Sequence, residues 1–221
     1  MKTRDRILVT TLALFNEEGE ANTTTIDIAN ELNISPGNLY YHFKGKDQII
    51  EELFQQYELA LGSTLLAPIE KPLSADQDDV EANWYFLYVV IEEMYQYRFL
   101  YHNLDNLLQR YPDIKRRFKR LLQLKRTALF VICHSLLEQS FIISHEEQLA
   151  GLVDNMALSL NFWLNYDQLL HGERPPQITI HQGVLQLMTM MAPYLGDEAL
   201  AFYSDCQSIY ASMLEQVESS E

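Results

Sequence analysis

The chain has 221 residues, a formal net charge of −15, and only two cysteines, Cys133 and Cys206. The cysteines lie far apart without metal-ligand spacing, which indicates a reduced, cytoplasmic protein. The net negative charge excludes DNA binding through overall electrostatic attraction, because affinity for nucleic acid comes largely from protein cations that displace counterions. The length predicts a head of about 50 residues and a larger body that can bury its own core.

The first predicted helix carries its apolar residues in an amphipathic pattern that ends near Phe15. Acidic residues follow it, so this segment is neither a signal peptide nor a membrane anchor. The longest uncharged run, residues 175–196, is interrupted by prolines, a glycine and polar side chains. We therefore expect no membrane span.

The next segment has the signals of a short capped helix. Thr24 is a good N-cap, and Asp27 stands at the spacing of a capping box. Ile28, Ala29 and Leu32 then form one apolar face, on which the small Ala29 leaves room for a second helix to cross closely.

A tight turn and a second helix follow at Asn33. Asparagine tolerates positive φ, and Ser35 can cap the next helix, in which Pro36 suits the first position. Gly37 keeps the exposed helix start free of bulk, so that backbone can approach a phosphate or a base edge. A plain structural hairpin is the alternative interpretation of this pattern.

Residues 39–46 place two tyrosines, a histidine and two lysines beside the buried Leu39 and Phe43. Such polar groups suit phosphate contacts. Residues 4–50 resemble the DNA-binding domain of the TetR/AcrR family of bacterial regulators, through Phe15, Gly19, Thr24, Ile28, Ala29, Ile34, Ser35, Leu39, Tyr40, His42, Phe43 and Lys46. Two residues depart from the family pattern: Asn33 replaces a frequent glycine, and Ile26 is apolar where a polar residue is more common.

The resemblance implies an all-α protein of about nine or ten helices. Residues 1–46 would form a three-helix helix-turn-helix head, and residues 47–221 a helical bundle for effector binding and dimerisation. The protein would be a transcriptional regulator, usually a repressor, that binds a palindromic operator in double-stranded DNA as a homodimer and is released by a small-molecule effector. The DNA-binding candidates are Thr24, Tyr40, Tyr41, His42 and Lys46 for phosphates, and Ser35, Pro36, Gly37 and Asn38 at the start of the recognition helix, with Asn38 reading a base.

The body is predicted to be helical throughout. A helix at 47–66 ends before Pro68, and a proline-rich acidic linker occupies 67–79. Ser144 and Glu147 have capping-box spacing at the start of one later helix. The further helices are expected at roughly 80–97, 102–110, 113–139, 146–171, 179–195 and 197–217.

Residues 110–126 contain eight of the chain's 16 basic residues. In one interpretation the cations are the solvated face of a helix, paired with the acidic body. In the other, this helix lies near the DNA and adds nonspecific attraction to phosphates, so that neutralising Arg116, Arg117 and Arg120 would flatten the salt dependence of binding.

Aromatic residues are dense between Trp84 and Tyr101, which fits ordinary core packing as well as a ligand cavity. The resemblance implies an effector pocket among the helices of the body. The ligand would be a hydrophobic or amphipathic small molecule of unknown identity. The candidate lining residues are Trp84, Tyr88, Tyr95, Phe130, His134, Phe162 and Tyr166.

The segments 146–171 and 179–195 offer broad apolar surface and are candidates for a dimer bundle. The residues concerned are Leu149, Leu152, Met156, Leu160, Trp163, Leu164, Met188, Met190 and Met191. The alternative is that these helices close the core of the monomer.

The histidines and cysteines show no metal-ligand or catalytic spacing, and no glycine-rich loop could cradle a phosphate. We therefore expect neither an enzyme nor a metal or cofactor. The main competing function is a helix-turn-helix protein with a partner-protein or chromosome-organising role and no small-molecule effector, and a purely structural helical adaptor comes third.

Overall fold

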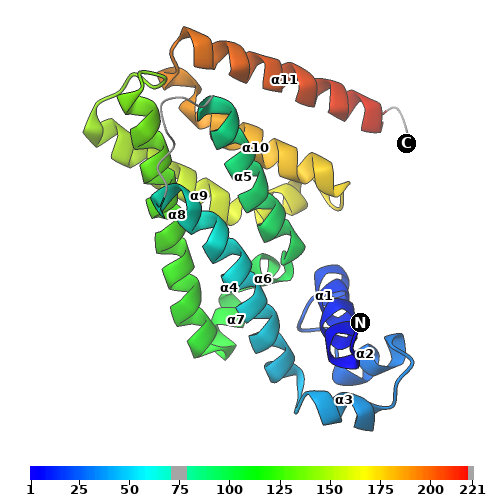
Figure 1. Ribbon diagram of the computed structural model, residues 1–221. Helices are drawn as coiled ribbons and strands as arrows, with labels where there is room; N and C mark the ends of the chain where they lie inside the picture. The colour runs from blue at the N-terminus through cyan, green and yellow to red at the C-terminus, as the bar shows by residue number, and fades with distance from the viewer. Residues whose placement is uncertain (71–78, 219–221) are drawn as a thin grey trace. The chain divides into compact units, whose positions relative to one another are not determined.

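The computed structural model describes residues 1–70 and 79–218, and all regular secondary structure in that part of the chain is helical (Figure 1). The predicted all-α class with a helix-turn-helix at the N-terminus is confirmed. The described residues form α1 Thr3–Glu18, α2 Thr25–Glu31, α3 Pro36–His42, α4 Lys46–Glu70, α5 Asp79–Gln96, α6 Phe99–His102, α7 Leu104–Arg110, α8 Pro112–Glu138, α9 Glu146–His171, α10 Pro176–Met191, the 3₁₀ turn η1 Ala192–Tyr194, and α11 Asp197–Glu218.

Two helix boundaries and one predicted cap differ from the sequence prediction in informative ways. The helix α4 continues through Pro68 to Glu70, because a proline in the last turn removes only one backbone hydrogen bond. The helix α10 begins at Pro176, since proline suits a first helical turn. The predicted Ser144 cap is wrong: His145 is the N-cap residue of α9, and the Ser144 hydroxyl donates to the His145 carbonyl at 3.3 Å. Most of the predicted linker, residues 71–78, lies outside the described residues.

The described residues divide into two compact units. Unit 1 comprises Met1–Ala60 with Gln96–Lys119, and unit 2 comprises the described parts of Leu61–Tyr95 and Arg120–Glu221. The helices α4 and α8 each contribute to both units. The domain boundary expected between residues 46 and 47 stays a prediction.

In unit 1, the first helix of the head packs against α6. The rings of Phe15 and Phe99 lie 5.2 Å apart. The side chain of Asn16 uses both ends of its amide, because its Nδ2 donates to the Gln96 carbonyl at 2.8 Å and its Oδ1 accepts from the Phe99 amide at 3.0 Å. Deeper in this unit, the buried hydroxyls of Tyr57 and Tyr101 bond to each other.

In unit 2, α9 packs closely against α10. The indole Nε1 of Trp163 donates to the Thr179 carbonyl at 2.9 Å, and the Thr179 hydroxyl donates to Asp167 at 2.8 Å. Asp167 also forms an ion pair with Arg174. A Cβ atom at Gly183 would lie 2.6 Å from the Trp163 Nε1, so only glycine permits this approach.

This packing bears on the two interpretations of the apolar residues in α9. Most of the side chains named for a dimer bundle are buried inside unit 2 and close the core of the monomer, and the pairing of these helices with a second copy stays a prediction. The buried residues are Leu149, Leu152, Met156, Leu160, Trp163, Leu164, Met188 and Met191, whereas Met190 is partly exposed.

Both cysteines are buried in unit 2. Burial raises the pKa of the Cys133 thiol to about 12 and also raises the pKa of Cys206. None of the helices in residues 1–70 and 79–218 combines the length and apolar character needed to span a bilayer.

The contact between Gly183 and Trp163 predicts that Gly183→Ala destabilises the protein by about 1–3 kcal/mol, because the added methyl forces the indole away from α10. Chemical denaturation measures the change. The matched control is Gly151→Ala in α9, where a Cβ meets nothing within 4 Å, and it should stabilise by about 0.5–1 kcal/mol. Equal effects of the two substitutions would contradict the close packing described here.

Candidate nucleic-acid interface and cavities

The start of α2 is fixed by the predicted capping box. The Thr24 hydroxyl accepts from the Asp27 amide at 3.2 Å, and the Asp27 carboxylate accepts from the Thr24 amide at 2.8 Å. The Thr24 hydroxyl also donates to the Asp27 carboxylate at 2.6 Å, and this side-chain bond, followed by the bond from the Thr24 amide, lowers the pKa of Asp27. The Asp27 carboxylate therefore stays ionised at the positive end of the helix.

The turn and the next helix also follow the sequence prediction. Asn33 adopts φ = 53°, and the Ile34 amide reaches back to the Ala29 carbonyl at 3.0 Å. The Ser35 hydroxyl then accepts from the Asn38 amide at 3.2 Å, and Pro36 is the first residue of α3. As a result, the start of the second helix is rigidly capped while Ser35, Pro36, Gly37 and Asn38 are all exposed.

The aromatic end of α3 lies beside the start of α2. The Tyr40 hydroxyl is 3.2 Å from the Thr25 hydroxyl, and the Tyr40 side chain is about half exposed. Tyr41 is 85% exposed and meets the His42 ring edge to face. Thr25 was missed in the sequence analysis, although a hydroxyl residue directly after an N-cap is a usable signal.

The ammonium group of the phosphate candidate Lys46 is already occupied by contacts within unit 1. Its Nζ donates to the backbone carbonyls of Glu20 and Thr23 at 2.7 and 3.0 Å, and it lies 3.0 Å from the Glu20 carboxylate. Glu20 is only 7% exposed and also pairs with Arg110 at 3.2 Å. This geometry favours a role for Lys46 in holding the turn before α2, and its phosphate role stays a prediction.

Several cations of the 110–126 segment are paired within their own unit. In unit 1, Arg117 bonds to both Glu51 and Glu58 and lies 4.9 Å over the Phe54 ring. Lys125 in unit 2 is an exception to the solvated face, because it is fully buried, donates to the neutral Asn161 amide at 2.8 Å, and has its pKa lowered by burial to about 7. Arg116 pairs with Asp113, and Arg126 with Asp154. These pairs favour the interpretation of the segment as a paired helix face, and its contribution to DNA binding stays a prediction.

The effector-pocket assignment of the seven ligand candidates stays a prediction, and these residues lie on α5, α8 and α9. Trp84 and Tyr88 of α5 stack with their ring centroids 5.8 Å apart, whereas Phe130 and His134 are half-exposed neighbours on α8. Tyr95 is partly exposed near the end of α5. A hollow formed by α9 and α10 contains the remaining two candidates, Phe162 and Tyr166.

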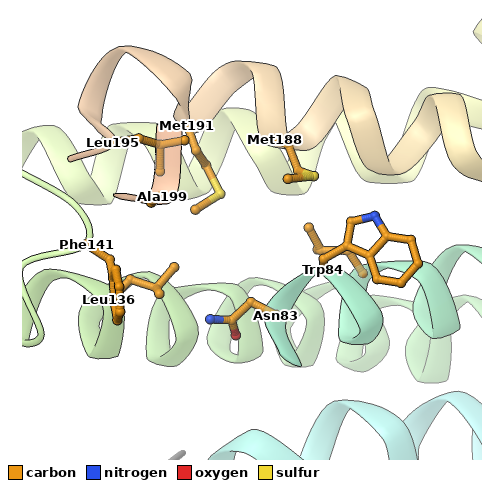
Figure 2. A pocket seen from close by; sticks show the side chains of 9 residues that line it. Asn83, Trp84, Leu136, Phe141, Met188, Met191, Leu195 and Ala199 are labelled. Atoms are coloured by element: carbon orange, nitrogen blue, oxygen red, sulfur yellow. The ribbon is translucent and has the colours of Figure 1, made fainter. Parts of the chain in front are cut away.

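Among these candidates, Trp84 lines a cavity in unit 2 whose lining is apolar except at Asn83 (Figure 2). The volume of this cavity that a water-sized sphere can occupy is about 30 Å³, which is room for one or two water molecules. The sequence analysis missed Asn83, because no local signal separates a buried asparagine from an exposed one. The lining residues are Asn83, Trp84, Leu87, Leu136, Phe141, Met188, Met191, Leu195 and Ala199.

The capped helix pair, with its exposed second helix, defines a helix-turn-helix DNA-binding protein. Two family models match this chain. "Bacterial regulatory proteins, tetR family" covers residues 7–53, and "Bacterial transcriptional repressor" covers residues 56–203. The chain therefore belongs to the TetR family of DNA-binding transcriptional regulators, which are not enzymes.

A TetR-family transcriptional regulator from Marinobacter aquaeolei VT8 is a close structural relative, with 33% identity, a TM-score of 0.80, and coverage of 93% of this chain and 99% of that chain. The HTH-type transcriptional repressor KstR2 of Mycolicibacterium smegmatis is 38% identical over 76 residues, which are 31% of this chain and 37% of that protein. The probable acrEF/envCD operon repressor of Escherichia coli K12 is 38% identical over 56 residues, 25% of this chain and 26% of its own length. Both curated relatives thus match over well under half of their length.

The contacts of Lys46 predict that Lys46→Met destabilises the protein by roughly 2–3 kcal/mol, since it leaves a buried carboxylate and two carbonyls without their main cation. The matched control is Lys44→Met, an exposed lysine two residues away, which should change stability by less than about 0.5 kcal/mol. Thermal and urea denaturation of both variants provide the measurement. A Lys46→Met protein as stable as the control would contradict the structural role.

Proposed function

We propose that this regulator is a homodimeric repressor that binds a two-fold symmetric operator and is released by a small apolar or amphipathic molecule. The observation that carries the proposal is the start of α3, where a capped and rigid helix end presents four exposed residues. Such a helix end can enter the major groove of DNA.

Within this surface, Asn38 is proposed to read a base, because a carboxamide can bond to adenine through both of its polar groups. Around this helix start, the DNA phosphates would be contacted by Thr24, Tyr40, Tyr41 and His42. The backbone of the DNA would lie close to Ser35, Pro36 and Gly37. Thr25 joins this set, because its hydroxyl lies against that of Tyr40.

Asn38→Ala should lower discrimination at one base position by about 1–3 kcal/mol, because the bidentate contact is lost. The measurement is selection of bound sequences from a random DNA pool, followed by affinity measurement on single-base variants. Asn30→Ala, which removes an exposed asparagine from α2, is the control and should leave the preference unchanged. An unaltered preference for Asn38→Ala would show that this side chain does not read a base.

The proposed dimer surface is the solvent-exposed face of α9. Leu158, Phe162 and Tyr166 follow one another at four-residue spacing and are 60%, 54% and 59% exposed. Leu169 and Leu170 extend this apolar stripe. An apolar helix face of this size fits a second copy related by two-fold symmetry, which would place two recognition helices roughly 34 Å apart. The exposure of Phe162 and Tyr166 thus favours a role for these two residues in the dimer surface and not in the effector pocket.

Phe162→Glu should raise the dimer dissociation constant at least about thirtyfold, because each copy would bury a carboxylate in an apolar interface. Sedimentation at several concentrations measures the change. The control is Ile209→Glu on α11, an equally exposed apolar residue outside the stripe. Wild-type protein that is monomeric at micromolar concentration would contradict the dimer, and dimers of Phe162→Glu as tight as the control would contradict this surface.

Effector control is proposed to act through unit 2, where the apolar cavity lies. A ligand can release DNA only if it binds more tightly to the state whose heads do not fit the operator. A broad metabolite screen for release of the DNA tests this step. A complex that no metabolite dissociates would favour a partner-protein or chromosome-organising role.

A further inference from the structure

The corner between α7 and α8 carries two polar side chains that reach the helix-turn-helix within unit 1. Arg110 is the last residue of α7, Tyr111 follows it, and α8 begins at Pro112. The Arg110 Nη1 donates to both carboxylate oxygens of Glu20, at 3.2 and 3.3 Å. The Tyr111 hydroxyl donates to the Asp47 Oδ1 at 2.8 Å. Adjacent residues of the corner thus each bind one carboxylate, and we call these two contacts the corner clamp.

The two carboxylates of the corner clamp lie on either side of the helix-turn-helix in the chain. Glu20 belongs to the turn that leads into the Thr24 cap of α2, and this turn is closed by the amide and hydroxyl of Thr23, which donate to the Gly19 carbonyl at 3.3 and 3.0 Å. Asp47 stands in the first turn of α4, which follows α3 after residues 43–45. The clamp therefore holds the chain just before α2 and just after α3.

The residues of the corner also hold each other. The Tyr111 amide donates to the Leu107 carbonyl at 3.0 Å, and the Arg110 guanidinium lies 5.3 Å from the centre of the Tyr111 ring. Burial, followed by the hydrogen bond to Asp47, raises the pKa of Tyr111 above its usual range. The hydroxyl therefore keeps its proton and remains a donor at physiological pH.

The charges at this corner do not favour direct binding of phosphates. Lys46 and Arg110 share the carboxylate of Glu20, and Asp47 adds a second negative charge beside Tyr111. Two cations thus meet two anions, so this cluster offers the DNA backbone no net positive charge. A role of the corner in DNA binding has to act through the helices that it holds.

We propose that Arg110 and Tyr111 are positioning residues for DNA recognition, which keep the helix-turn-helix in the orientation that fits DNA without touching the DNA themselves. A helix pair held less firmly would adopt the binding orientation for only a fraction of the time, and the apparent affinity would fall by that fraction. The inference rests on the proposed function, because it takes the exposed start of α3 as the surface that reads DNA.

The first test is Tyr111→Phe, which removes one hydroxyl and changes no charge. Its affinity for the sequence that the wild type selects from a random DNA pool should fall about three- to tenfold. Its affinity for unrelated DNA of the same length should change less than about twofold, because non-specific binding depends on charge and not on fit. A variant that is merely less stable would lose both affinities in the same proportion, so an unchanged ratio of the two would overturn the proposal.

A double-mutant cycle assigns the effect to the bond itself. Asp47→Ala removes the acceptor together with a negative charge, and loss of that charge would by itself strengthen binding to DNA. We expect this variant instead to bind the selected sequence about as weakly as Tyr111→Phe, and the double variant to lie within about twofold of either single one. Losses that add fully in the double variant would show that this bond does not position the head.

Arg110→Met separates positioning from direct phosphate contact. It should lower affinity for the selected sequence about three- to tenfold and leave the salt dependence of binding unchanged. Loss of a phosphate contact would reduce the slope of that dependence by about 0.9. A reduction of that size would contradict a positioning role for Arg110.

The matched control is Tyr203→Phe in unit 2, where the hydroxyl contacts Thr189 and Gln207 at 2.9 and 2.8 Å. This variant should bind the selected sequence as tightly as the wild type, and a loss equal to that of Tyr111→Phe would refute a specific role of the corner clamp. The wild type tests the proposed function separately. Wild-type protein that selects no sequence would overturn both proposals, whereas wild-type selection with unchanged corner variants would overturn this inference alone.

Discussion

The recognition surface depends on one nearly buried carboxylate. Glu20 stands in the turn before α2, and Lys46 and Arg110 bring cations to it from α4 and α7 within unit 1. Lys46 also binds the carbonyls of Glu20 and Thr23, so this side chain fixes the path of the turn as well as its charge. Because α2 and α3 follow this turn directly, these contacts hold the capped starts of both helices in place within unit 1.

Local rules explain why the helix-turn-helix could be predicted from the sequence. The Thr24 cap, the positive φ of Asn33 and the Ser35 cap each depend on residues at most three positions away. The partners of Lys46 lie 23 and 26 residues earlier, and no periodicity indicates them. The helix α9 shows a second limit, since apolar residues occupy both its buried and its exposed face. A sequence pattern does not say which of two apolar faces packs inside the monomer.

The acidic total and the internal ion pairs together constrain how the protein recognises DNA. Arg4 pairs with Glu52 and Arg117 with Glu51 and Glu58, so both of these cations are used in ion pairs within unit 1. The start of α3 offers a hydroxyl, an amide and exposed backbone, and Lys44 is an exposed cation just beyond the end of this helix. Binding through such groups requires close fit and is less sensitive to salt than binding through many lysines and arginines.

The two cysteines have a consequence for how this protein can be studied and for what it can sense. Burial raises the pKa of Cys133 to about 12, so this thiol is protonated at pH 7. Oxidants and alkylating reagents attack the thiolate, and burial of both thiols slows them further. The chain is thus poorly suited to report on oxidative stress. For the same reason a single cysteine introduced on α3 would be labelled selectively, which permits a distance measurement between the two heads of the proposed dimer on DNA.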